Sequence, residues 1–188
     1  PMCYCAHRSI DAALDVKPRV ALDRIAGIEV TLGKIQAKTL KNHQPRNGLD
    51  AIFSVEFGVA AALIAGNVGL REVSDEFVAR DDVQKLLAKV TVNAHEDYDP
   101  AWPSMARFDQ VHVRLADGNT ISSEPVHRAL GDSTRPLASQ DLRAKFIDCF
   151  AAGGSTVDAA QLLDRLQRIE TVASIRDLYR IAPAAVAA

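Results

Sequence analysis

The chain has 188 residues, of which 48% are hydrophobic and 24% charged, a composition typical of a soluble globular protein of one domain, with or without an appended element. Lys and Arg number 22 against 24 Asp and Glu, so the formal net charge of −2 gives no electrostatic reason to expect nucleic acid or an anionic membrane as a partner. The longest apolar stretch, residues 59–65, is far shorter than the roughly 20 residues that a membrane-spanning helix needs.

The cysteines indicate the compartment. There are three of them, an odd number with two at Cys3 and Cys5, which does not make a disulfide framework. The chain opens without the apolar segment and basic flank of a secretory signal. We therefore expect a reducing, cytoplasmic location.

Three helices are predicted in the first half of the chain. Apolar residues on one face predict a helix over 9–16, which Pro18 ends. Residues 49–65 are apolar nearly all round and contain no proline, which predicts one helix in the interior, closed by Gly66. A third helix is expected over 81–88.

Alternating apolar residues predict the strands. The pattern is clear over 28–32 and 111–115, and a further strand begins at 90–92. Apolar residues also alternate over 120–126, and the turn signal Asp117-Gly118 separates this stretch from 111–115, which predicts a hairpin. The stretch between the second and third strands, residues 94–108, is predicted to be a loop long enough to suspect function or contact with another surface.

From Ser139 the pattern becomes helical, with Ser139 as the expected cap of a helix that Gly153 and Gly154 break. Ser155 and Asp158 resemble a capping box that starts the next helix. The order of elements predicts an α+β fold: a small antiparallel sheet covered by helices, followed by C-terminal helices. We place the boundary between residues 1–137 and 138–188.

The residue types offer only weak candidates for chemistry. Cys3, Cys5 and His7 alternate, so in an extended segment they would face one way and suggest a zinc or redox site. The spacing is too short for known closed zinc sites and no fourth ligand can be placed, so terminal or interface thiols are the favoured interpretation. We predict no metal and no cofactor.

Other polar residues are interpreted as structural. His95, Glu96, Asp97 and Asp99 crowd one loop but lack the glycine turn of a calcium site, so a solvated acidic loop is favoured. His112 and His127 are expected to be surface or hydrogen-bonded histidines.

Glu56 falls within the apolar helix. A buried carboxylate there would need a partner, and a single exposed stripe is the simpler account. No P-loop, nucleophile elbow, dinucleotide fingerprint or zinc-protease motif occurs. From the residues alone, the chain is an α+β domain without a self-sufficient active site.

The opening PMCYCAHRSIDAAL resembles a segment of the MmgE/PrpD family, whose members include 2-methylcitrate dehydratase, cis-aconitate decarboxylase and iminodisuccinate epimerase. That segment typically reads Lys, two residues, then Pro-x-Cys-x-x-x-His with Ile-Asp-Ala following. The residues in register are Pro1, Cys3, His7, Ile10, Asp11 and Ala12. The resemblance continues through the Phe-Ser landmark at Ser54, the VHVRLADG strand and VHRALGDSTRPLASQDLRAKF, and so covers nearly the whole chain.

The resemblance implies a fold and a chemistry. Family members are much longer, with a large helical domain, a smaller α+β lid and final helices that return to the helical domain. This sequence resembles the lid and returning helices only, and because it begins inside a family motif we expect a fragment, a split-gene product or part of a longer chain. The family's reaction is abstraction of a proton next to a carboxylate, followed by loss of water or carbon dioxide, or by return of the proton on the other face.

In that family most pocket residues belong to the helical domain. The resemblance places Cys3 in the segment that faces the cleft, and His7 matches the family's histidine, so both are candidate substrate-binding residues. Ser54, within the predicted helix, is expected to bond back to a backbone carbonyl rather than to substrate.

Two functional hypotheses follow. The first is the lid portion of a lyase or isomerase acting on a small di- or tricarboxylate, inactive without the helical domain; whether this chain is itself an enzyme stays open. The alternative is a non-catalytic binding or oligomerisation module of the same fold. Expected partners are a small carboxylate and either a homo-oligomer or the helical domain, and neither nucleic acid nor membrane.

Overall fold

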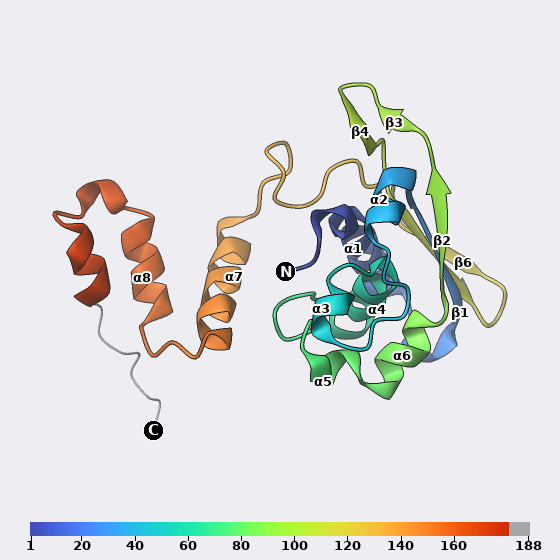
Figure 1. The fold of residues 1–188 in the computed structure, drawn as a ribbon, viewed down its shortest axis with the longest axis horizontal. Coiled ribbons are helices and arrows are strands. Elements are labelled where there is room, and N and C mark those ends of the chain that lie inside the picture. Colours follow the sequence, from blue (N-terminus) through green and yellow to red (C-terminus); the bar gives the residue numbers. More distant parts are fainter. Residues whose placement is uncertain (181–188) are drawn as a thin grey trace. The chain divides into compact units, whose positions relative to one another are not determined.

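The computed structural model describes residues 1–180, with the side chain of Tyr179 left out (Figure 1). The final residues of the predicted second region, 181–188, lie outside that part. The helices are α1 His7–Val16, α2 Lys34–Thr39, α3 Gly48–Ala51, α4 Val55–Ala65, α5 Asp75–Val78, α6 Asp81–Leu87, α7 Ser139–Ala152 and α8 Ala159–Leu166. The strands are β1 Ile25–Gly33, β2 Val90–His95, β3 Tyr98–Asp99, β4 Trp102–Ala106, β5 Gln110–Leu115 and β6 Thr120–Ser122. Short 3-10 helices cover Tyr4–Ala6, Lys17–Arg19, Leu22–Arg24, Ile169–Thr171 and Ile175–Arg180.

The main sheet has the strand order β2-β1-β5-β6. The α+β class is confirmed, and β1 pairs antiparallel with β5, as β5 does with β6 around the predicted Asp117-Gly118 turn. The sheet as a whole is mixed rather than antiparallel, because β1 and β2 run parallel. The helices between these two strands carry the chain back across the sheet, which is the connection that a parallel pair requires.

Helices cover one face of this sheet (Figure 1). The residues that point towards them, Ile28, Val30, Val111 and Val113, are buried, whereas Glu29 on the opposite face is exposed. Helices α1 and α4 pack on each other and on the sheet, and α4 is buried on nearly every side. The expectation of an interior helix is confirmed, and it explains why the sequence of α4 is apolar all round.

The predicted single helix over 49–65 is wrong as one element, because it is interrupted at Ile52–Ser54. Ser54 has extended backbone, and its hydroxyl accepts a hydrogen bond from the Phe57 N–H at 3.1 Å. Ser54 is therefore the N-cap of α4, and does not bond back to a carbonyl within a helix as expected. Gly66 closes α4 in the left-handed region, as predicted.

The loop predicted over 94–108 contains the small hairpin of β3 and β4. Trp102 in β4 is 53% exposed, and its ring lies 5.8 Å from the Arg128 guanidinium. Arg128 also pairs with Asp99 of β3. The hairpin is short and is held by polar contacts rather than by a hydrophobic core of its own. Its sequence therefore lacks the alternating apolar residues from which a strand is predicted.

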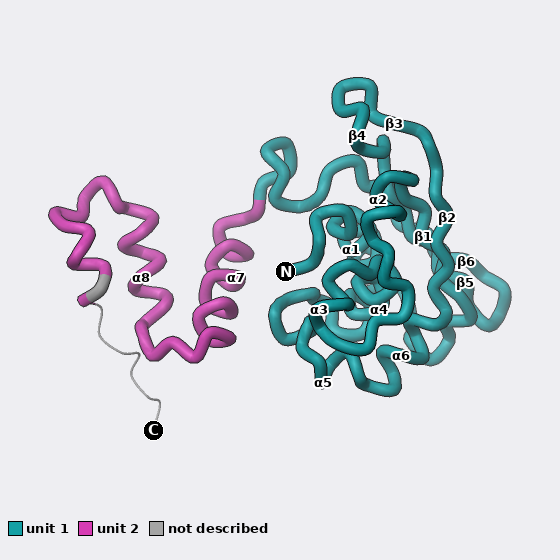
Figure 2. Tube along the Cα trace, viewed as in Figure 1, with its two compact units in different colours: residues 1–136 teal, residues 137–188 magenta. Residues whose placement is uncertain are grey.

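The chain divides into two compact units, residues 1–136 and 137–188 (Figure 2). Within the second unit, Ala138 and not Ser139 is the N-cap of α7, and Asp158 caps α8 by accepting from Gln161 N at 2.9 Å. An ion pair of 2.7 Å between Arg143 and Asp164 joins these two helices. Among the described residues of this unit, only Leu163 is a buried hydrophobic residue.

A tight backbone contact fixes the start of α3. The Gly48 N–H donates to Asp75 Oδ1 at 2.7 Å, and a Cβ at position 48 would overlap the carbonyl oxygen of Val73. Because backbone cannot move aside cheaply, we expect Gly48→Ala to lower the free energy of unfolding by about 1–3 kcal/mol in urea unfolding. Gly27→Ala is the control, since the added Cβ meets only the flexible end of Arg114. Equal losses for the two variants would contradict the prediction.

Candidate functional site

The N-terminal segment lies against the turn that precedes α4. The Cys3 N–H donates to the Ile52 carbonyl at 2.9 Å. The side chain of Met2 is buried, and its Cε lies 3.3 Å from the position of a Cβ at Gly58. Cys3 is thereby fixed beside the N-terminal end of α4.

His7 fixes the same segment from its other side. It begins α1, and its Nε2 lies 3.0 Å from the Met2 carbonyl oxygen. Because a carbonyl oxygen only accepts, Nε2 is the donor. The His7 ring also contacts the ring of Tyr4, with 5.3 Å between centroids. The structure therefore gives His7 a positioning contact towards the segment that carries Cys3.

The two N-terminal thiols are half-buried neighbours. Burial raises the pKa of the Cys5 thiol to about 11, and Cys3 adds to that rise. A thiol that stays protonated near neutral pH is a poor nucleophile. Cys5 is therefore a packing residue rather than a reactive one.

The alternating cluster of Cys3, Cys5 and His7 presupposed an extended segment. Residues Tyr4–Ala6 form a 3-10 helix and His7 begins α1, so the segment is not extended. Within residues 1–180, no three His, Cys, Asp or Glu side chains come together in a way that suits a metal ion.

Glu56 is buried, so the interpretation as an exposed stripe is wrong. Its Oε1 lies 2.7 Å from His43 Nδ1, and the Ser54 hydroxyl donates to Oε2 at 3.2 Å. The free-energy cost of burying this carboxylate in the first turn of α4 is offset by its two hydrogen-bond partners and by the positive end of the helix dipole. The sequence signal for it is an acidic residue two positions after a serine that caps a helix.

A second buried polar cluster links α1 to the start of β5. Arg8 Nη2 donates to Asp109 Oδ1 at 2.7 Å, and the Ser9 hydroxyl donates to Asp109 Oδ2 at 2.8 Å. Arg8 also donates to the carbonyl oxygen of Ala106. Burial raises the pKa of Asp109 to about 6, against the opposing effects of Arg8 and Ser9. Sequence reasoning missed this cluster, because its members lie far apart in the chain.

The acidic residues of the 94–108 segment are engaged in ion pairs. Lys34 holds the pKa of Glu96 below its ordinary value through a hydrogen bond, and Arg128 does the same for Asp99. Asp97 pairs with Arg107. These contacts neutralise the acidic loop.

The remaining histidines have local partners. His95 bonds to the Phe108 carbonyl at 3.0 Å, and His127 bonds to the Arg107 carbonyl at 2.9 Å. His112 lies 2.7 Å from the hydroxyl of Ser122. All three are hydrogen-bonded, as expected for His112 and His127.

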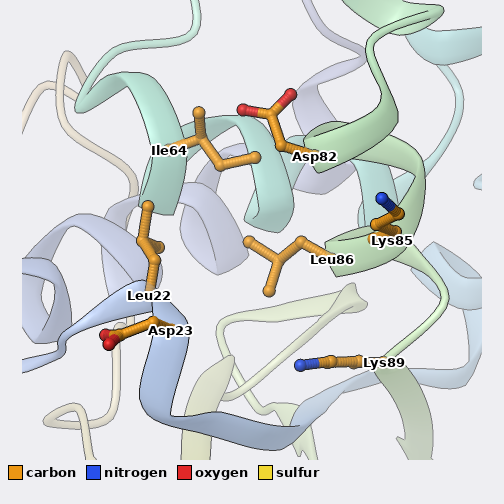
Figure 3. A pocket seen from close by; sticks show the side chains of 7 residues that line it. All are labelled: Leu22, Asp23, Ile64, Asp82, Lys85, Leu86 and Lys89. Carbon is orange, nitrogen blue, oxygen red and sulfur yellow. The ribbon is translucent and has the colours of Figure 1, made fainter.

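A shallow depression of about 240 Å³ lies near the C-terminal end of α4. Figure 3 shows its lining, with apolar side chains at the centre and charged ones around them: Leu22, Ile64, Leu86, Asp23, Asp82, Lys85 and Lys89. Helix α4 has 11 residues and is therefore about 16 Å long. The depression is thus separated along α4 from Cys3 and Glu56, which lie at its N-terminal end.

A larger hollow of about 390 Å³ lies between α1 and residues 124–135. Arg135 pairs with Asp11 within this hollow, whereas Arg128 pairs with Asp99 and Asp15 with Arg19, which lie outside its lining. Asp11 accepts from Arg135 at 2.6 Å and from the Leu130 N–H at 2.7 Å, which ties this loop to α1.

These features define a two-layer α+β unit whose N-terminal segment is fixed against a capped, buried helix. The sequence matches the model of the MmgE/PrpD C-terminal domain over residues 1–171, and the chain belongs to that family. No curated protein matches it. Among residues 1–180, no helix is both long enough and apolar enough to cross a membrane.

Proposed function

We propose that the chain is the lid-like C-terminal portion of a lyase or isomerase that acts on a small di- or tricarboxylate. The observation that carries this proposal is the family match, which begins at the segment of Cys3 and His7 and extends over residues 1–171. The reaction class is proton abstraction next to a carboxylate. Such a reaction needs a base, an acid and positive charge to stabilise the developing carbanion.

The chain's own contribution would be to bind and enclose the substrate. Cys3 is the proposed contact, because it lies in the segment that the family resemblance places at the cleft. His7 is the proposed positioning residue, since it holds the Met2 carbonyl. A lid that closes over the cleft would exclude water from the carbanion.

The second unit supports docking on a helical domain. Large apolar side chains remain exposed along its helices, namely Leu142, Ile147, Ile169 and Ile175. Exposed large apolar residues, together with a single buried hydrophobic residue among those described in this unit, are typical of a segment that another domain covers. Residues 138–188 are proposed to return to that helical domain.

Turnover assays test the proposal. We expect the 188-residue chain alone to convert none of 2-methylcitrate, cis-aconitate or iminodisuccinate. When it is fused to a helical domain of the family, we expect turnover of at least one of the three. Exchange of a substrate C–H proton with D2O, followed by NMR, reports the proton abstraction directly. Turnover by the chain alone, or no exchange with any of the three in the fusion, would contradict the proposal.

The alternative is a non-catalytic binding or oligomerisation module. The same exposed apolar residues would then be covered by symmetric pairing of two copies. Sedimentation velocity distinguishes the two: a stable homo-oligomer of the chain alone, combined with an inactive fusion, favours the alternative.

The Cys3 side chain provides a direct mutational test. In the active fusion we expect Cys3→Ala to raise KM about threefold to tenfold, the loss of one hydrogen bond to substrate. Cys149→Ser is the control, because Cys149 is exposed in the second unit. Unchanged KM in Cys3→Ala would remove Cys3 from the substrate contacts.

A further inference from the structure

An exposed histidine is held by a buried carboxylate at the start of α4. The side chain of His43 is 66% exposed, whereas that of Glu56 is 7% exposed. A carboxylate that loses its water is costly unless its partners are fixed. Here one of the partners is an imidazole whose own side chain is largely exposed to solvent. An exposed imidazole is not needed to pack the interior around Glu56.

The hydrogen bonds decide which nitrogen of His43 is available. An ionised carboxylate only accepts, so His43 Nδ1 carries the proton that Glu56 Oε1 accepts. Glu56 Oε2 is occupied by the Ser54 hydroxyl, so both carboxylate oxygens are used. His43 is thereby oriented through Nδ1, and Nε2 is the nitrogen that an incoming group would meet.

The surroundings of His43 carry positive charge. Lys41 and Arg46 are exposed on the same segment, and no acidic residue occurs between positions 41 and 49. The next acid, Asp50, accepts a hydrogen bond from the Asn47 amide at 2.8 Å. Arg46 also donates to Gln84 Oε1 at 3.2 Å. Because Glu56 is buried, the exposed charges of residues 41–49 are those of Lys41 and Arg46, which suit an anion.

This segment is also next to the proposed substrate contact. The Asn42 N–H donates to the Phe53 carbonyl at 3.2 Å, and the Cys3 N–H donates to the adjacent Ile52 carbonyl at 2.9 Å. Residues 3 and 42 thus flank the same short turn before α4. His43 follows directly after Asn42.

We propose that residues 41–46 form an anion-binding site in which His43 Nε2 binds a carboxylate group of a small organic acid, with Lys41 and Arg46 supplying charge. Glu56 acts through His43 as a positioning residue. The ligand class rests on the proposed function, and the site deepens it by assigning binding residues that lie outside the family landmarks quoted above.

Titration of the 188-residue chain with sodium succinate, at constant ionic strength, tests the site. We expect saturable shifts of the His43 ring signals in 1H–15N spectra, and none with the neutral analogue succinamide. His112 is the matched comparison, because its Nδ1 lies 2.7 Å from a partner that is a hydroxyl rather than a carboxylate. Equal shifts at His112 would mean general anion attraction and would overturn the proposal.

Two variants separate binding from positioning. His43→Gln keeps an amide donor for the buried Glu56, so it should keep the fold and raise the Kd for succinate about tenfold or more. Glu56→Leu removes the acceptor of the Nδ1 proton, so it should raise the Kd to a similar extent and remove the preference of the His43 ring for a protonated Nδ1, while the His112 ring is unaffected. An unchanged Kd in His43→Gln, or an unchanged His43 tautomer in Glu56→Leu, would overturn the proposal.

Failure of this site and failure of the proposed function give different results. If succinate does not shift His43 while the fusion with a helical domain turns over a substrate, the site is wrong and the function stands. If succinate binds at His43 and no fusion abstracts a proton, the site stands and the function is wrong.

Discussion

Replacing Arg8 with methionine is expected to lower the free energy of unfolding of the first unit by about 3–5 kcal/mol at pH 8. The guanidinium of Arg8 is 3% exposed and its partner Asp109 is fully buried, so the substitution leaves a carboxylate without its counter-charge in the interior. It also leaves the Ala106 carbonyl without this donor. Urea unfolding followed by circular dichroism measures the loss.

The loss should depend on pH, and its sign follows from the pKa of Asp109. Burial raises this pKa from 3.8 to about 6, so the contribution of Asp109 to stability is complete below pH 3.8 and is lost as the pH rises through 6. Without Arg8, which lowers the pKa of Asp109, that pKa rises further. We therefore expect the difference between wild type and Arg8→Met to be smaller at pH 5 than at pH 8, by about 1–3 kcal/mol.

A matched pair controls for the general effect of removing an arginine. Arg24 pairs with Asp117, and both side chains are substantially exposed. Arg24→Met should cost less than about 1 kcal/mol at either pH. If the two variants lost equal stability, or if the loss in Arg8→Met did not change with pH, the buried pair would not have the role assigned to it.

The second large effect is expected from Phe57→Ala, which should lower the free energy of unfolding by about 3–5 kcal/mol. The Phe57 side chain is completely buried in α4 and meets the ring of Phe77 edge to face, with 6.4 Å between centroids. Alanine leaves a cavity between α4 and α5 that neighbouring side chains fill only in part. Urea unfolding measures the loss, and Phe53→Ala, at a position 38% exposed, is the control.

Phe57→Ala also tests the link between packing and the proposed site. The Phe57 N–H is the group that Ser54 caps, so loosening of this turn should disturb Ser54 and Glu56 together. We expect the His43 ring signals to change in Phe57→Ala and to stay as in wild type in Phe53→Ala. A loss of less than about 1 kcal/mol would show that the core repacks around position 57.

Local patterns in the sequence predicted most of the elements of the first unit. Alternation of Val111 and Val113 indicated β5, and the Asp117-Gly118 turn indicated its hairpin, because both are decided by neighbouring residues. The apolar composition of α4 predicted its interior position. The N-cap at Ser54 was missed because an apolar run on both sides concealed the break in the helix.

What the sequence by itself determined about this protein is its class, α+β, and its family, since both depend on ordered local signals along the chain. The tertiary structure alone decided which strands pair in parallel, that Arg8 meets Asp109 at a separation of 101 residues, and that Glu56 is buried beneath His43. These contacts depend on how elements pack in space. A buried charge is stable only where the fold brings a partner to it, and no local pattern in the sequence records where that partner will be.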